Sequence, residues 1–230
     1  MTPEEFRGLI QAISILALPA IFAITFHEAA HGLVAHWLGD DTAWSMGRVT
    51  FNPLKHIDPV GTILIPLLLF FSTGFLFGYA KPVPVNFGRL RHPRRDMIFV
   101  ALAGPATNIL LAVVSAALQW FLPFIPNVGH SWAAKTLSRS IDFNLILAVF
   151  NLIPLPPLDG GRVAVAALPD ALAFPLARLE RSGLFILVGV LILLPMVGQT
   201  LHLNLDFFRY IILIPAAYLR HLISWLVGWS

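Results

Sequence analysis

A series of long apolar runs without charged residues constrains the fold of this chain more than any other feature. Three runs carry no Asp, Glu, Lys or Arg: 9–26, 97–125 and 183–201. Further apolar stretches cover 59–80, 143–158 and 210–230. A helix crosses the bilayer core with about 20 apolar residues, and only 12% of the 230 residues are charged. We therefore predict an all-α polytopic membrane protein with about five to six transmembrane helices.

Charge and cysteine content exclude some classes of binding partner and some kinds of catalytic chemistry. The formal net charge is +3, but the Lys and Arg residues lie mainly between the apolar runs. There they set membrane topology rather than a nucleic-acid surface, so no nucleic-acid partner is expected. The chain contains no cysteine, which excludes disulfide and thiolate chemistry. We find no internal repeat and no attached soluble domain.

Local patterns predict where helices begin and end. One long helix is expected over 5–38, and others follow at about 96–122, 140–152, 160–168, 183–199 and 207–228. Residues 42–58 partly alternate apolar and polar side chains, which predicts a short strand or two. The segment 153–161, IPLPPLDGG, contains three prolines and two glycines and therefore breaks the helix.

The most informative motif is His-Glu-Ala-Ala-His at 27–31, inside the first apolar segment. On a helix, His27 and His31 lie on one face about one turn apart, so both imidazoles can bind one metal ion. Glu28 is adjacent and can act as a general base, which is the zincin arrangement. Ionisable side chains are costly inside a membrane and usually mark a function. The alternative is a chance pattern or a merely solvated helix end.

A catalytic zinc ion needs a third protein ligand and keeps one position open. Asp159 is the best candidate, because it lies in an apolar segment where irregular backbone must be buried or line a cavity. A buried carboxylate also needs a cation nearby. The alternative is an interfacial aspartate that caps a helix starting at Gly160. Two histidines and one aspartate with an open position suit one zinc ion per chain.

Three segments together resemble the site-2 protease family of intramembrane zinc metalloproteases: HEAAH at 27–31, AGPATN at 103–108 and NLIPLPPLDGG at 151–161. NPLKHIDPVGT and YAKPVPVN resemble the short prokaryotic members without a PDZ domain. The resemblance implies that zinc is bound by His27, His31 and Asp159 and that Glu28 is the base. It also implies roles in the substrate cleft for Asn108, Asn151, Pro154 and Pro157.

The resemblance covers about residues 20–168, and the segment 183–230 carries no matched motif. We therefore expect a single membrane-embedded domain over 1–230, with a catalytic core at about 5–168 and C-terminal helices at 183–230. His56 and Asp58 flank the turn in NPLKHIDP. They are candidates for a regulatory or substrate-contacting role, and a turn-stabilising role is an equal alternative.

Topology follows from the depths of the two metal-binding segments. His27 lies 18 residues after Leu9, and Asp159 lies 18 residues after Ile141. Two segments that reach one ion at similar depth should cross in the same direction, so an odd number of crossings should lie between them. Two apolar runs lie there, 59–80 and 96–122. We therefore expect 59–80 to be re-entrant, or a hairpin packed against the core, rather than a full span. Ten Lys and Arg residues then lie on one side and four on the other. This bias places the active site toward the cytoplasm in the cell membrane of a prokaryote.

The predicted function is an endopeptidase that cuts membrane-embedded segments of membrane-protein substrates, within or beside the lipid bilayer. The rival is a metal-ion or proton transporter in which His27, His31 and Asp159 form the transport site. Transporters often contain repeats, which this chain lacks, and they need no base beside the metal. A non-catalytic membrane scaffold is disfavoured by the intact set of three ligands and a base. The sequence leaves the oligomeric state open.

Overall fold

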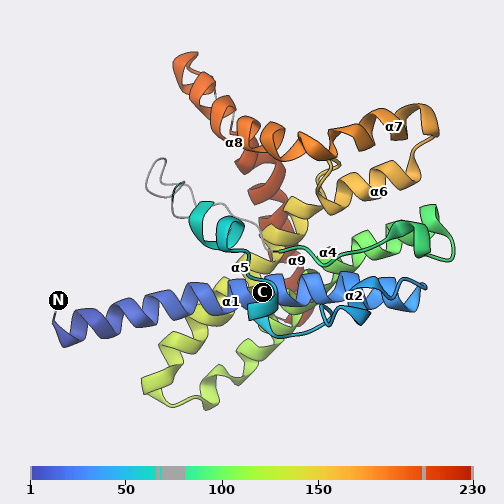
Figure 1. The fold of residues 1–230 in the computed structure, drawn as a ribbon. Helices are drawn as coiled ribbons and strands as arrows, with labels where there is room; N and C mark the ends of the chain where they lie inside the picture. Colours follow the sequence, from blue (N-terminus) through green and yellow to red (C-terminus); the bar gives the residue numbers. More distant parts are fainter. Residues whose placement is uncertain (1, 66–67, 69–80, 204–205, 229–230) are drawn as a thin grey trace.

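The chain forms a helical bundle, described here from a computed structural model that covers residues 2–65, 68, 81–203 and 206–228 (Figure 1). The long helices are α1 (Pro3–Trp37), α4 (Pro93–Leu118), α5 (Asn127–Asn151), α8 (Gly183–Thr200) and α9 (Ile214–Val227). Shorter helices are α2 (Thr42–Ser45), α6 (Asp159–Ala167) and α7 (Asp170–Arg178). The remaining short turns of helix are η1 (Pro53–Lys55), η2 (Pro59–Leu64), η3 (Phe87–Arg89), η4 (Gln119–Phe124), η5 (Leu179–Arg181) and η6 (Arg209–Leu213).

Local sequence signals define both ends of the long helix α1. The Thr2 side chain accepts a hydrogen bond from the Glu5 N–H, and the Glu5 carboxylate accepts one from the Thr2 N–H. This capping box satisfies backbone donors that a helix N-terminus leaves free. The helix then runs for 35 residues, with Pro19 inside it. It ends before Gly39, whose φ of +110° favours a residue without a side chain.

The core of the bundle is formed by α1, α4 and α5, with α9 packed against α4 and α5. The buried face of α4 includes the small residues Ala101, Gly104, Ala112 and Ala116. Because their side chains are small, the neighbouring helix backbones can approach α4 closely. One apolar cluster joins α4, α5 and α9 through Ala112, Ala116, Ile141, Leu145, Ala216 and Ile223. Helices α6 and α7 pack against each other, and α6 also packs against α4.

The all-α prediction agrees with the described residues, but the predicted number of spans is not confirmed. Three helical segments there are long and apolar enough to cross a membrane: Glu4–Trp37, Pro93–Phe124 and Arg209–Val227. A fourth arises if Asp170–Arg181 and Phe185–Gly198, which meet at 79°, count as one span. Helix α5 begins at Asn127, well before the expected 140, and α7 was not predicted.

The strand expected within 42–58 is not confirmed, because the described part of the chain has no strand there. Residues 42–45 form the single helical turn α2 instead. The buried Asp40 carboxylate accepts hydrogen bonds from both the N–H and the hydroxyl of Thr42. Such a local bond stabilises a turn in competition with a strand. Gly47, at a φ of +61°, follows this turn.

The expected re-entrant segment 59–80 lies largely outside the described residues, apart from 59–65 and 68. Its two flanks are described, and they meet. The Lys81 N–H donates to the His56 carbonyl at 2.9 Å, and the Arg91 N–H donates to the Leu38 carbonyl at 3.0 Å. These contacts hold the two flanks beside each other. The predicted same-side placement of 40–58 and 81–96 relative to a membrane stays a prediction.

Candidate metal centre

Two imidazoles on one face of α1 form the centre of the candidate site. His27 and His31 are 5% and 7% exposed, and their Nε2 atoms lie 3.0 Å apart. The rings are nearly perpendicular, at 83°. Their spacing of four residues puts them one above the other on the helix, as the sequence predicts. Their ring edges point at each other from two successive turns of the same helix.

Asp159 joins this pair from the first residue of α6. Its Oδ2 lies 3.1 Å from Nε2 of His27 and 3.4 Å from Nε2 of His31. This oxygen is buried, and no hydrogen-bond donor of the described residues reaches it. The three side chains offer ligand atoms that all lie within 4.8 Å of one another. The break between α5 and α6 therefore brings a carboxylate to the face of α1.

Hydrogen bonds on the far side of each ring fix which nitrogen carries the proton. His27 Nδ1 lies 2.6 Å from Oδ1 of Asn108, and His31 Nδ1 lies 2.7 Å from the carbonyl oxygen of Val100. Both oxygens only accept, so each Nδ1 must donate. In the neutral imidazole, each Nε2 then presents a lone pair toward the other and toward Asp159. Metal-bound histidines have this outer hydrogen bond almost without exception.

These observations test whether the residues fit a metal ion. Two lone pairs and one carboxylate oxygen converge in a buried space, and they repel one another unless a cation lies among them. Two imidazoles and one carboxylate form a ligand set that zinc prefers, with a further position left open. The side chains present therefore fit a zinc ion. They would hold it through Nε2 of His27, Nε2 of His31 and the Asp159 carboxylate.

Glu28 follows His27 on α1 and is half-buried. Its Oε2 accepts a hydrogen bond from the Val83 N–H at 2.7 Å. Residues 81–86 form neither helix nor strand, and Arg48 holds the start of this segment by donating to the carbonyls of Lys81 and Pro82 at 3.0 and 3.3 Å. The carboxylate is thus oriented by a backbone segment that precedes α4.

Glycine at 104 is a requirement of the site that the sequence reading missed. A Cβ at this position would lie 2.5 Å from Nε2 of His27 and 2.5 Å from Nε2 of His31. No side chain larger than hydrogen fits there without moving the imidazoles. Gly104 belongs to the AGPATN segment, and its spacing of four from Val100 and Asn108 puts all three on one face of α4. The spacing of four residues can be read from the sequence, but the sequence does not show that this face of α4 packs against the histidines of α1.

The four residues predicted to line a substrate cleft lie in different surroundings. Asn108 is fully buried and contacts His27, so it lies behind the metal centre. Asn151 is half-buried and donates to the Leu147 carbonyl of its own helix at 3.0 Å. Pro154 is exposed, and Pro157 is half-buried, in the turn between α5 and α6. Their predicted roles with substrate remain predictions.

His56 and Asp58 hold the loop that precedes the segment 59–80. His56 is 2% exposed, and its Nε2 donates to the Thr50 carbonyl at 2.9 Å. Asp58 accepts from the N–H groups of Val60 and Gly61 and caps η2. These contacts are local and stabilise the turn, which is one of the two roles that the sequence left open.

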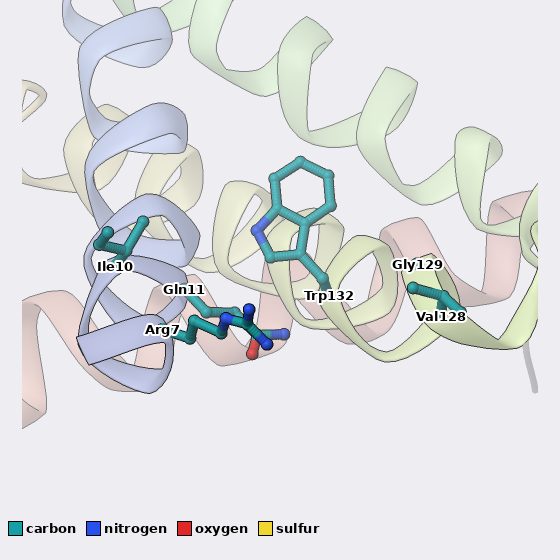
Figure 2. Close-up of a pocket in the computed structure, with 6 residues that line it drawn as sticks. All are labelled: Arg7, Ile10, Gln11, Val128, Gly129 and Trp132. Atoms are coloured by element: carbon teal, nitrogen blue, oxygen red, sulfur yellow. The ribbon is translucent and has the colours of Figure 1, made fainter. Parts of the chain in front are cut away.

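A separate pocket lies far along α1 from the histidines (Figure 2). It has a volume of about 420 Å³ and is lined by Arg7, Ile10, Gln11, Val128, Gly129 and Trp132. Ile10 precedes His27 by 17 residues, which is about 25 Å along a helix. Trp132 on α5 donates from its indole N–H to the hydroxyl of Ser14 on α1 at 2.9 Å. This pocket is therefore not part of the metal centre.

Comparisons with known proteins find several relatives with related names. The chain is 37% identical over 192 residues to "Putative zinc metalloprotease YwhC" of Bacillus subtilis (strain 168), across 79% of this chain and 81% of that protein. It is 33% identical over 162 residues to "Putative zinc metalloprotease MJ0611" of Methanocaldococcus jannaschii, across 69% and 72%. It is 28% identical over 180 residues to "Putative zinc metalloprotease Rip2" of Mycolicibacterium smegmatis, across 78% and 66%. No family model matches the chain. No solved structure matches it either.

Proposed function

This chain belongs to the site-2 protease-like family of zinc metalloproteases, and from that premise we propose that it is an intramembrane zinc endopeptidase. The apolar helices and the family make it an integral membrane protein. The observation that carries the proposal is the buried group of His27, His31 and Asp159, with Glu28 beside it on an apolar helix. A metal site with a neighbouring base suits hydrolysis better than storage or structure.

The roles of the side chains follow from their positions. His27, His31 and Asp159 hold the zinc ion, which when bound polarises a carbonyl and lowers the pKa of water. Glu28 takes a proton from the attacking water as the water oxygen bonds to the peptide carbonyl carbon. The same carboxylate returns that proton to the amide nitrogen as the C–N bond breaks. The Val83 N–H, bound to Oε2 of Glu28, holds the carboxylate in place for both transfers.

The proposed substrate is a membrane protein whose transmembrane segment enters this bundle from the lipid bilayer. The catalytic groups lie on an apolar helix because the scissile bond lies in or near the membrane. A helical substrate must unwind locally, since its peptide groups are otherwise engaged in internal hydrogen bonds. We place the active site toward the cytoplasmic side of a prokaryotic cell membrane, on the bias of Lys and Arg toward that side.

Cleavage by Glu28→Gln protein tests the proposal. Wild type in detergent should cut a peptide that contains a transmembrane segment, and Glu28→Gln should cut it at least about 10²-fold more slowly. The variant keeps size and polarity but loses the basic oxygen, so its zinc content should equal that of wild type. Equal rates in both proteins would remove Glu28 as the base. Zinc flux in proteoliposomes without any cleavage by wild type would support the transporter instead.

Cysteine labelling tests the proposed orientation. The native chain has no cysteine, so single cysteines at Ser45 and Arg91 give clean signals. Both should react with an impermeant maleimide from the same, cytoplasmic side, because the Leu38 carbonyl bonds the Arg91 N–H at 3.0 Å. Labelling of either position from the outer face would contradict the proposed placement.

A further inference from the structure

A chain of buried amides runs from the metal centre into the interface of α4 and α5. Asn108 Nδ2 donates to the Ala23 carbonyl at 3.1 Å and to Oδ1 of Asn144 at 2.8 Å. Asn144 Nδ2 donates in turn to the Ser140 carbonyl at 2.9 Å. Asn144 is 1% exposed and Asn108 is fully buried. Three helices of the bundle thus contribute to one hydrogen-bonded chain that ends at Nδ1 of His27.

Two backbone carbonyls set the direction of this chain. The carbonyl of Ser140 can only accept, so the amide nitrogen of Asn144 must face it and its oxygen must face Asn108. The carbonyl of Ala23 imposes the same choice on Asn108. With both of its N–H groups used, Asn108 turns its oxygen to His27. The proton of His27 is then held on Nδ1, and the lone pair of Nε2 faces Asp159 and His31.

Packing alone does not account for two buried amide side chains at these positions. An unpaired amide in the interior of a membrane bundle costs free energy, and an apolar side chain of similar size would fill the space without that cost. Asn144 touches neither Asp159 nor the histidines through any described hydrogen bond. Among the described residues, its hydrogen bonds lead to the centre through the Asn108 side chain alone.

We propose that Asn144 is a positioning residue, which orients the Asn108 amide and thereby directs the lone pair of His27 toward the zinc ion. The inference rests on the zinc centre of the proposed function. Outer-shell partners of metal-bound histidines typically contribute about 10–100-fold to metal affinity. Asn144 acts one bond further out, and the Ala23 carbonyl still orients Asn108 without it. The contribution of Asn144 is therefore at the lower end, about tenfold.

Zinc affinity, measured by competition with a chromophoric chelator on purified protein, tests this role independently of peptide cleavage. Asn144→Leu removes the acceptor for Asn108 and should weaken zinc binding about tenfold. Ser115→Ala is the matched control, because Ser115 is buried on α4 and its hydrogen-bond partner among the described residues is at the far end of the same chain, the Ser140 hydroxyl 2.8 Å away. Its zinc affinity should equal that of wild type.

A double variant separates a positioning role from a structural one. If Asn144 acts through Asn108, Asn144→Leu should cause no further loss of zinc affinity when Asn108 is already alanine. Equal affinities of wild type and Asn144→Leu, or full additivity in the double variant, would overturn the inference. Should Asn144→Leu fail to fold, Asn144→Ala removes the same acceptor without adding bulk, and wild-type affinity in it would be equally decisive. A wild type that binds no zinc would instead refute the zinc centre itself.

Discussion

The bundle of α1, α4 and α5 and the helix α8 are both apolar, but they differ in which side chains they bury and which they expose. Helix α8 contains no charged residue and exposes large side chains such as Phe185, Leu193 and Met196. Among the described helices it contacts η5, the turn that precedes it, and it extends away from the bundle (Figure 1). The bundle instead buries three candidate metal ligands and two asparagines between small residues.

The difference shows that hydrophobicity and function are separate properties of a membrane helix. Apolar surface alone is sufficient to place a helix in lipid. A site requires helices that approach closely, which needs small residues, and polar groups that are satisfied within the protein. Helix α4 meets both requirements on one face through Val100, Gly104 and Asn108. Helix α8 meets neither requirement among its described contacts.

The largest effect should come from removing a ligand from the bundle. Asp159→Ala deletes the carboxylate that opposes both Nε2 atoms. Structural zinc sites with four ligands contribute about 10–16 kcal/mol, so an even share per ligand is about 2.5–4 kcal/mol, or about 70- to 900-fold in affinity. The zinc content of purified Asp159→Ala and His31→Ala proteins should therefore fall from about one per chain to near zero. Full occupancy in either variant would remove that residue from the ligand set.

A glycine pair compares the two regions directly. Gly104→Ala on α4 places a methyl group 2.5 Å from the imidazoles, whereas a Cβ at Gly189 on α8 meets only Leu193 Cδ1 at 3.9 Å. Overpacking of this kind costs about 1–3 kcal/mol, so if the metal-bound arrangement bears that cost, the zinc affinity of Gly104→Ala should fall by about 5- to 150-fold. Gly189→Ala should bind zinc as wild type does. Chelator competition on both proteins provides the measurement, and equal affinities would show that α4 does not confine the site.

A pair of polar substitutions, one on α4 and one on α8, should give a smaller difference in zinc affinity. Asn108→Ala removes the acceptor of His27 Nδ1 and should weaken zinc binding by about tenfold or somewhat more. Thr200→Val on α8 removes a hydroxyl that bonds only the Met196 carbonyl of its own helix, so zinc binding should not change. The same chelator assay applies. If the threonine change were as harmful as the asparagine change, the loss would reflect general destabilisation rather than outer-shell support.

Several features of the fold followed from local sequence. The 35-residue helix α1, the break after Asn151 and the start of α6 at Asp159 lie close to the expected positions. The resemblance to the site-2 protease family is confirmed by the relatives. The strand near 42–58 and the count of five to six spans were not confirmed. Near residue 42 a helical turn forms in place of the predicted strand, because the Asp40 carboxylate accepts hydrogen bonds from Thr42 and stabilises that turn.

The sequence by itself determined that this protein lies in a membrane and that His27, Glu28 and His31 share one stretch of helix. The first conclusion depends on the length of the apolar runs, and the second depends on the spacing of residues on a helix, which helix geometry fixes. Only the tertiary structure decided that Val100, Gly104 and Asn108 face the histidines, that Asp159 meets them, and that Val83 binds Glu28. These contacts join residues 55 to 81 positions apart, and Asp159 lies 132 and 128 positions from His27 and His31. They arise from how closely the small faces of α1 and α4 pack, which no local pattern specifies.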